Sequence, residues 1–245
     1  MPRIHCPLPL TTGQALDLPA GAARHVQVLR AQPGDTLTLF AGEPGAGEFE
    51  ATVTRMGRSE VQVLVGAHRA VEREAPRAIH LLAGIIANER MDWLVEKATE
   101  LGAASFTPLL AARCVLKLKG ERSERKLAHW QAVAVAACEQ SGRNGVPPVH
   151  EAASLAQWIK ANPHPPVAAV ATPLRLLLSL QPDARPLREA AAGDAAVWLL
   201  SGPEGGLAPE EEAAARGAGF LPVTLGPRVL RAETAPLAVL AALLV

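Results

Sequence analysis

The sequence predicts an α/β protein in which a parallel sheet follows a small antiparallel β domain. Residues 1–70 contain short segments of alternating apolar and polar residues, separated by glycine and turn residues, which is typical of antiparallel strands. From Ile79 onward, apolar runs alternate with segments of helical periodicity, which indicates parallel strands joined by helices. Near the carboxyl terminus, two glycine-bearing turns each follow an apolar run and precede a helix-like segment.

The N-terminal domain is expected to be a compact barrel of short strands. The segments that alternate most clearly are Thr36–Phe40, Phe49–Thr54 and Glu60–Val65. Residues 71–77 are charged, contain Pro76 and lack periodicity, so we interpret them as a linker. This interpretation places a second domain at residues 78–245.

The second domain is expected to begin with the strand Ile79–Ala83. Asn88 is placed to cap a helix whose apolar residues recur at helical spacing and which Gly102 ends. A second helix is expected from Ser123 to Ser141. Further strands are expected at Val167–Ala171, Val197–Leu200 and Pro222–Leu225.

Two more helices are predicted by their ends and their composition. Pro209 is followed by three acidic residues, a pattern that favours the first turn of a helix. The apolar run Ala235–Val245 is shorter than the roughly 20 residues that a bilayer span requires, so we expect a buried helix.

The composition limits the kinds of function that the chain can have. It has 245 residues, a formal net charge of zero, no tyrosine and 3% aromatic residues. The scarcity of aromatic rings argues against a base-stacking RNA platform, so RNA binding would depend on charge and shape. Basic residues predominate between Arg113 and Lys126. This patch is a candidate for phosphate contacts, and the alternative is a solvated helix face.

The cysteines and histidines suggest neither a metal site nor a disulfide framework. Cys6, Cys114 and Cys138 are far apart, and the seven histidines show no ligand spacing. Residues 1–10 lack a sustained apolar region, so we expect no signal peptide. These features favour a cytoplasmic protein without metal and without a membrane anchor.

The glycine-bearing turns outline a cofactor cleft. Gly202–Gly206 encloses the rigid Pro203, and the segment Leu225–Arg231 forms the second turn. The first turn is not a phosphate-binding loop, because Leu207 and Ala208 stand where a P-loop has lysine and a hydroxyl residue. The alternative for the first turn alone is a tight strand-to-helix connection without a ligand.

These turns and two further motifs give the chain a family resemblance. The motifs are Glu96–Gly102, Glu139–Arg143, Gly202–Gly206 and Leu225–Ala235. In this order they resemble the RsmE family of 16S rRNA uridine-N3 methyltransferases. The resemblance implies a SPOUT-type parallel sheet with a C-terminal trefoil knot, after a PUA-like β-barrel that binds RNA. It also implies S-adenosylmethionine as cofactor, 16S rRNA in the small ribosomal subunit as substrate, and a homodimer.

The resemblance assigns roles to particular residues. The expected cofactor-binding residues are Thr172, Leu200, Gly202, Pro203, Glu204, Gly205, Gly206, Leu225, Gly226, Leu230 and Thr234. The resemblance makes Arg24, His25, Arg30 and Arg113 the expected RNA-binding residues, and the basic patch adds Lys117, Lys119 and Arg122. Arg113 lies in a segment that matches the family's Glu-Arg-Ser element, although Ala112 and Cys114 replace its neighbours.

Methylation of uracil N3 requires that a proton leave and that the remaining charge be stabilised. Arg231 and Arg143 are the candidate cations, and Glu233 or Glu204 the candidate proton acceptors. A salt bridge that braces the loop is the alternative for Arg231, and a helix-end contact is the alternative for Arg143. The alternative functions are a SPOUT methyltransferase with another RNA target atom and a catalytically silent ribosome-binding protein.

Overall fold

The computed structural model describes residues 1–114, 120–163 and 172–245. The expected strand Val167–Ala171 lies outside these residues, as do the expected RNA-binding residues Lys117 and Lys119. In the part of the chain that is described, none of the helices combines the length and the apolar character that a bilayer span requires.

The chain divides into two compact units. The N-terminal unit comprises Met1–Glu74 and Val135–Val146, and the C-terminal unit comprises Ala75–Ala134 and Pro147–Val245. The sequence predicts a linker at residues 71–77 and no return of a later segment to the first domain.

The return of Val135–Val146 to the N-terminal unit depends on contacts between residues far apart in sequence. The side-chain amide of Asn144 donates to the Val71 carbonyl at 2.6 Å, and the Val146 N–H donates to the Gly42 carbonyl at 2.9 Å. Local periodicity carries no signal for such pairs, which is why the sequence did not indicate them.

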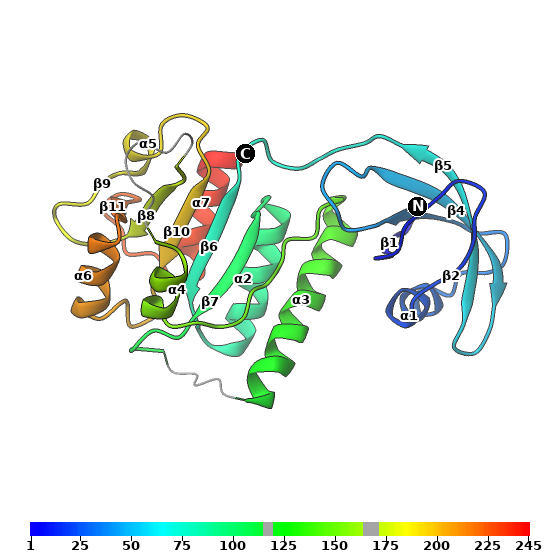
Figure 1. Cartoon of the computed structure of the whole chain (residues 1–245), viewed down its shortest axis with the longest axis horizontal. Helices are drawn as coiled ribbons and strands as arrows, with labels where there is room; N and C mark the ends of the chain where they lie inside the picture. The colour runs from blue at the N-terminus through cyan, green and yellow to red at the C-terminus, as the bar shows by residue number, and fades with distance from the viewer. Residues whose placement is uncertain (115–119, 164–171) are drawn as a thin grey trace. The chain divides into compact units, whose positions relative to one another are not determined.

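The N-terminal unit is built on a five-stranded sheet with the order β1-β3-β4-β5-β2 (Figure 1). Its elements are β1 (Arg3–His5), β2 (Ala15–Asp17), α1 (Ala20–Val28), β3 (Thr36–Phe40), β4 (Glu48–Met56) and β5 (Val61–Arg69). Strand β3 coincides with the predicted strand, and β4 and β5 extend further than predicted. Val61, Val63 and Val65 of β5 are fully buried in the core, as the alternating pattern indicates.

Helix α1 was not predicted from the sequence. It buries mainly small residues, Ala22 and Ala23, together with Val26. Alanine contributes little to an apolar stripe, so the helical periodicity of this segment is weak.

The C-terminal unit is built on a six-stranded parallel sheet with the order β7-β6-β10-β8-β11-β9. Its strands are β6 (Ile79–Gly84), β7 (Ser105–Leu109), β8 (Leu174–Leu178), β9 (Arg185–Pro186), β10 (Val197–Ser201) and β11 (Leu221–Thr224). Its helices are α2 (Asn88–Glu100), α3 (Glu121–Ser141), α4 (Leu155–Ala161), α5 (Leu187–Ala190), α6 (Pro209–Gly217) and α7 (Thr234–Leu244), and the end of α3 belongs to the N-terminal unit. The expected parallel α/β architecture is confirmed.

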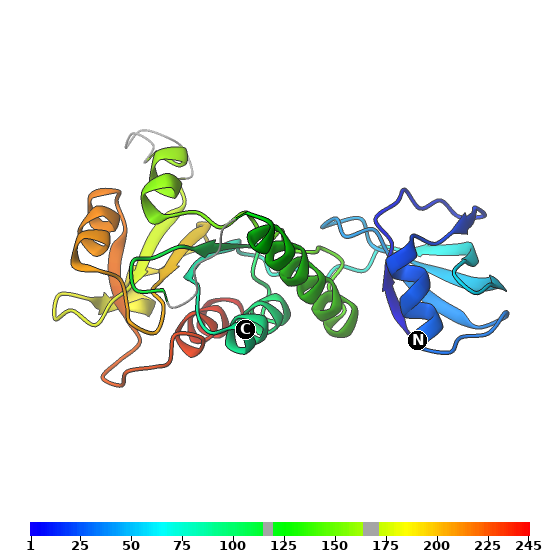
Figure 2. The same ribbon diagram turned by 90° about the horizontal axis from the view of Figure 1, so that it is seen from below.

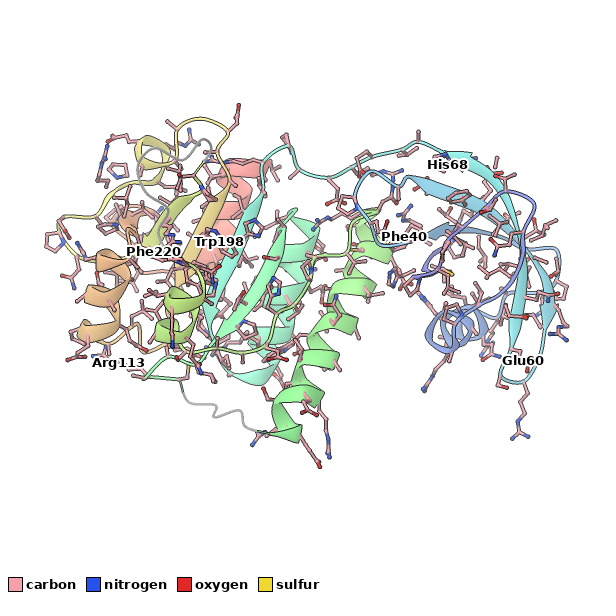
Figure 3. The ribbon with its side chains drawn as sticks, in the orientation of Figure 1. Phe40, Glu60, His68, Arg113, Trp198 and Phe220 are labelled. Atoms are coloured by element: carbon pink, nitrogen blue, oxygen red, sulfur yellow. The ribbon has the colours of Figure 1, made fainter. Side chains whose placement is uncertain are left out.

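Helices cover both faces of this sheet, as Figure 2 shows, with α2 and α7 on one face and α4 and α6 on the other. Leu82 of β6 and Leu200 of β10 point toward α4 and α6 and share a core cluster with Trp158 and Phe220. The Trp158 ring packs edge-on against both Trp198, at 5.0 Å between centroids, and Phe220, at 5.7 Å. Figure 3 labels Trp198 and Phe220. This aromatic cluster anchors α4 to the sheet.

Strand β8 changes the expected position of Thr172. Sequence analysis placed Thr172 after a strand, whereas β8 begins at Leu174, so Thr172 precedes a strand. The sequence does not predict β8, and the strand expected before Thr172 lies outside the described residues.

The strand order determines where a ligand site can form. Strand β10 lies between β6 and β8, although β8 precedes it in the chain. In a parallel sheet all carboxyl ends share one edge, and ligands bind beyond that edge where the strand order changes direction.

Candidate functional site

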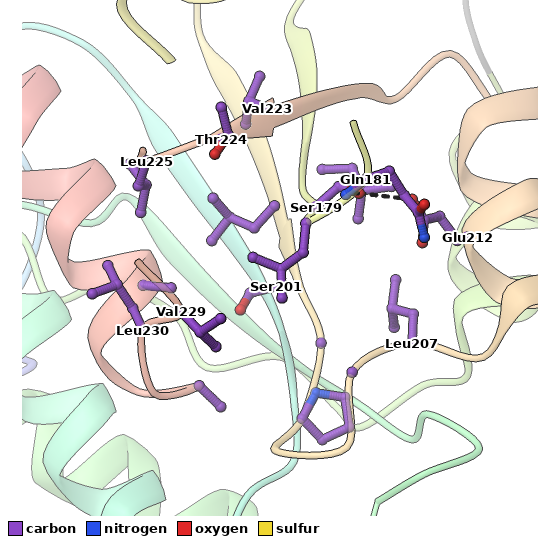
Figure 4. Close-up of a pocket in the computed structure, with 18 of the residues that line it drawn as sticks. Ser179, Gln181, Ser201, Leu207, Glu212, Val223, Thr224, Leu225, Val229 and Leu230 are labelled. Carbon is purple, nitrogen blue, oxygen red and sulfur yellow. Dashed lines mark hydrogen bonds between the residues drawn. The ribbon is translucent and has the colours of Figure 1, made fainter. Parts of the chain in front are cut away.

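A cavity of about 370 Å³ lies beyond the carboxyl ends of β8, β10 and β11 (Figure 4). Three chain segments form most of its lining: the residues after β8, the glycine loop Gly202–Gly206 after β10, and the segment Leu225–Ala232 after β11. Both turns that the sequence singled out therefore border one cavity.

The glycine loop is fixed by close backbone packing. A Cβ at Gly202 would lie 2.9 Å from the Leu207 nitrogen, so the loop closes on itself only without a side chain there. The Gly206 N–H donates to the Pro203 carbonyl at 2.8 Å, and Gly206 has a positive φ of 69°. The loop is consequently a rigid turn whose backbone faces the cavity.

The segment after β11 also turns at a glycine. Gly226 has a φ of 106°, in the left-handed region that favours glycine. The Thr224 hydroxyl lies 3.2 Å from both the Gly226 N–H and its carbonyl oxygen. From this turn Leu225, Val229 and Leu230 line one side of the cavity, which makes that side apolar (Figure 4).

The opposite side of the cavity is polar and was not predicted. Ser179, Gln181 and Glu212 line it, and the Ser179 hydroxyl donates to Glu212 Oε1 at 2.8 Å (Figure 4). Glu212 also pairs with Arg216 at 3.1 Å. Ser179 and Gln181 follow β8, so the sequence could have indicated them only if that strand had been recognised.

Arg113 lies at the cavity although sequence analysis assigned it to RNA. Its Nη1 donates to the Gly205 carbonyl at 2.9 Å. The Arg113 segment is held by Glu211, which accepts from the Ala112 N–H and from the Ala208 N–H, both at 2.9 Å. Glu211 thus ties this segment to the first turn of α6.

Cys114 follows Arg113 in the chain and replaces a serine of the resembled element. Its thiol donates to the Leu109 carbonyl at 3.4 Å, and burial raises the pKa of the thiol. A thiol with a raised pKa is a poor nucleophile, so we assign no catalytic step to Cys114.

Most, but not all, of the expected cofactor residues line the cavity. Those that do are Gly202, Pro203, Glu204, Gly205, Gly206, Leu225, Gly226 and Leu230. Leu200 is fully buried in the core beneath it, and Thr234 is the exposed first residue of α7. Thr172 precedes β8 and so stands at the opposite end of that strand from the cavity.

The expected catalytic residues belong to two different units: Arg231 and Glu233 to the C-terminal unit and Arg143 to the N-terminal unit. Arg231 is exposed next to the cavity lining, and its carbonyl accepts from the Thr234 and Ala235 N–H groups. Glu233 is 8% exposed, and its Oε1 lies 3.8 Å from Arg90 Nε. Arg143 belongs to the N-terminal unit, where its Nε donates to Glu74 Oε2 at 2.9 Å.

Two further residues that line the cavity were not among the expected site residues. Arg228 lines the cavity within the second glycine turn, and Ser201 lies at the end of β10. The sequence could have indicated Arg228 as a site residue, because it belongs to the same motif as Arg231.

The expected RNA-binding residues fall in separate parts of the chain. Arg24 and Arg30 are exposed in the N-terminal unit, where His25 Nδ1 lies 3.0 Å from Glu139 Oε2. Arg122 is exposed in the first turn of α3. In the described ranges no group of three or more histidine, cysteine, aspartate or glutamate side chains is arranged to hold a metal ion.

Comparisons with known proteins agree on one kind of enzyme. Residues 73–244 match the family model described as an RNA methyltransferase domain. A methyltransferase from Legionella pneumophila, solved with bound S-adenosylmethionine, is 38% identical, with a TM-score of 0.89 over 98% of this chain and 96% of its own.

Further relatives carry a more specific name. A ribosomal RNA small subunit methyltransferase E from Neisseria gonorrhoeae, bound to S-adenosylmethionine, is 37% identical, with a TM-score of 0.89 over 99% of this chain and 96% of its own. The protein of the same name from Mycobacterium bovis is 35% identical over 85% of this chain and 77% of its own length.

Proposed function

Because the chain belongs to the RNA methyltransferase domain family, we propose that it uses S-adenosylmethionine to methylate N3 of a uridine in the 16S rRNA of the small ribosomal subunit. The observation that carries the proposal is the cavity between the two glycine-bearing segments. It is present in a chain 37% and 38% identical to enzymes solved with that cofactor.

The residues present fit S-adenosylmethionine. The cavity volume of about 370 Å³ falls within the range of roughly 300–1,000 Å³ that is typical of small-molecule sites. Cβ atoms at Gly206 and Gly226 would meet nothing within 4 Å, so open space adjoins both turns. Backbone groups of the two turns would recognise the adenine edge, while Leu225 and Leu230 provide an apolar wall.

When bound, S-adenosylmethionine supplies an electrophilic methyl group on a sulfonium. The protein's own task is to hold the acceptor in line with that group, and rigid glycine and proline turns suit this task. The acceptor nitrogen must lose its proton, and the charge that remains spreads onto the two flanking carbonyl oxygens of uracil.

Arg113 and Arg228 line the cavity, and Arg231 adjoins it. We assign Arg228 and Arg231 to the two uracil oxygens, because donors placed near developing charge stabilise it, whereas Arg113 donates to the Gly205 carbonyl. Of the two expected proton acceptors, Glu204 lines the cavity and Glu233 is buried, so the proposal retains Glu204. Arg143 stays a candidate cation, and its guanidinium pairs with Glu74 in the N-terminal unit.

The proposal includes the finer features that the family resemblance implies. These are a trefoil knot around the glycine-bearing segments, a PUA-like N-terminal unit that binds RNA through Arg24, His25 and Arg30, and a homodimer without metal. A cytoplasmic location follows from the ribosomal substrate.

The decisive experiment supplies labelled S-adenosylmethionine and unmethylated small subunits, followed by digestion of the RNA and mass spectrometry. The expected product is 3-methyluridine. A 2′-O-methylated nucleoside or another methylated base would instead indicate a different target atom. No transfer, with no calorimetric binding of S-adenosylmethionine at millimolar concentration, would favour the silent ribosome-binding protein.

A further inference from the structure

Arg90 lies between carboxylates from the two glycine-bearing segments. Its Nη1 is 3.8 Å from Glu204 Oε1, and its Nε is 3.8 Å from Glu233 Oε1. Glu204 belongs to the loop after β10, and Glu233 follows the segment after β11. Arg90 itself is in the first turn of α2 and is not among the cavity-lining residues.

The negative charge of the buried Glu233 carboxylate is compensated by Arg90. The residue is 8% exposed, and its buried Oε2 has no hydrogen-bond partner in the described part of the chain. A buried carboxylate without compensation is costly, because it has lost hydration and gained little in return. The guanidinium of Arg90 supplies an opposite charge at close range.

Glu204 is held by the same end of α2. Its Oε1 accepts from the Ala87 N–H at 3.1 Å, and Ala87 is the N-cap of that helix, which has no side-chain cap. Sequence analysis expected Asn88 in the capping position, whereas the helix begins at Asn88 and a carboxylate from the glycine loop approaches its amino end. A negative charge here also complements the helix dipole.

We propose that Arg90 is a positioning residue for the methyl donor. Through Glu204 and Glu233 its charge keeps the two glycine-bearing segments at the separation that donor binding requires. The inference rests on the proposed function, since it concerns the same cavity. Without Arg90, Glu233 must move toward water, and it displaces the segment Leu225–Ala232 as it moves.

The first test is calorimetric titration of S-adenosylmethionine into wild type, Arg90→Ala and Arg90→Lys. We expect the dissociation constant to rise about tenfold for Arg90→Ala, equivalent to about 1.4 kcal/mol, and to stay within about threefold for Arg90→Lys. Arg55→Ala is the matched control, because Arg55 lies 3.7 Å from Asp17 and 3.5 Å from Glu60 but is exposed in the N-terminal unit. It should bind like wild type.

The second test separates positioning from general destabilisation. Adding Glu233→Gln to Arg90→Ala removes the uncompensated charge, so the double variant should bind the donor more tightly than Arg90→Ala alone. In steady-state assays Arg90→Ala should raise the KM for the donor more than it lowers kcat. Should Arg90→Ala fail to fold, Arg90→Gln replaces it in both comparisons.

Two results would overturn the inference: wild-type affinity in Arg90→Ala, or a double variant that binds no better than the single one. A wild-type protein that does not bind S-adenosylmethionine would instead count against the proposed function. The two failures are therefore distinguishable in the same set of titrations.

Discussion

Gly84 and Pro203 pack so closely that a Cβ at residue 84 would lie 2.4 Å from the Pro203 nitrogen. It would also lie 2.9 Å from the Gly202 carbonyl carbon, so backbone atoms rather than a flexible side chain would have to move. Strand β6 therefore ends directly against the glycine loop, and the position of that loop depends on the absence of a side chain at residue 84.

Gly84→Ala should displace the glycine loop and weaken donor binding. Overpacking of this kind costs about 1–3 kcal/mol of folding free energy, and the loop must shift to relieve it. Because the shifted loop fits the donor less well, we expect the dissociation constant for S-adenosylmethionine to rise roughly tenfold or more. Calorimetry measures the effect. Gly217→Ala, in α6, is the control, because a Cβ there would meet nothing within 4 Å. Equal affinities for the two variants would contradict the prediction.

Arg113→Ala removes the hydrogen bond to the Gly205 carbonyl. Because Arg113 is exposed, the loss should be modest, about 1 kcal/mol or roughly fivefold in donor affinity. Arg125→Ala deletes an exposed arginine that pairs with Glu121 within α3, and it should leave donor affinity unchanged. If both variants bind equally, Arg113 does not support the loop.

Local patterns were sufficient to predict much of the cavity. Strand β10 and the glycine turn after it are continuous in sequence, and so are β11 and the turn at Gly226. An apolar run followed by glycine and proline predicts a strand and a rigid turn without knowledge of the rest of the chain.

The remaining parts of the site depend on tertiary contacts. Ser179 and Gln181 reach the cavity because β8 lies between β10 and β11, an order that no local pattern contains. Arg90 was not singled out, because its partners Glu204 and Glu233 are more than a hundred residues away in the chain. Arg143 was assigned to the site from its motif alone, and its ion pair with Glu74 lies within the N-terminal unit.

The buried Cys138 thiol should make the stability of the protein depend on pH. Burial raises its pKa to about 12 from the ordinary value of 9.0. Since the folded protein retains this proton more strongly than the unfolded chain, the thiol contributes stability below pH 9.0 that is lost as the pH rises toward about 12. Urea unfolding across this window should show a shallower decline for Cys138→Ala than for wild type. If stability declined equally with pH in wild type and Cys138→Ala, the pKa of the Cys138 thiol would not be raised.

Arg231→Ala should reduce turnover more than donor affinity. The backbone carbonyl of Arg231 accepts the first hydrogen bonds of α7, and the substitution preserves it, whereas the exposed guanidinium is lost. Single-turnover rates and calorimetry on the same variant measure the two effects separately. An equal loss of both would show that Arg231 braces the cavity instead of acting on the acceptor.

Charge reversal at Arg24, Arg30 and Arg122 should weaken binding to small-subunit RNA and flatten its dependence on salt. Each lost phosphate contact lowers the slope of log K against log salt by about 0.7–0.9. All three side chains are exposed, so the substitutions should leave the unfolding midpoint unchanged. Arg55→Glu is the control, since that arginine already has carboxylate neighbours in Asp17 and Glu60. If the slope stays at its wild-type value, these arginines form a solvated surface, and the RNA must be bound by other residues.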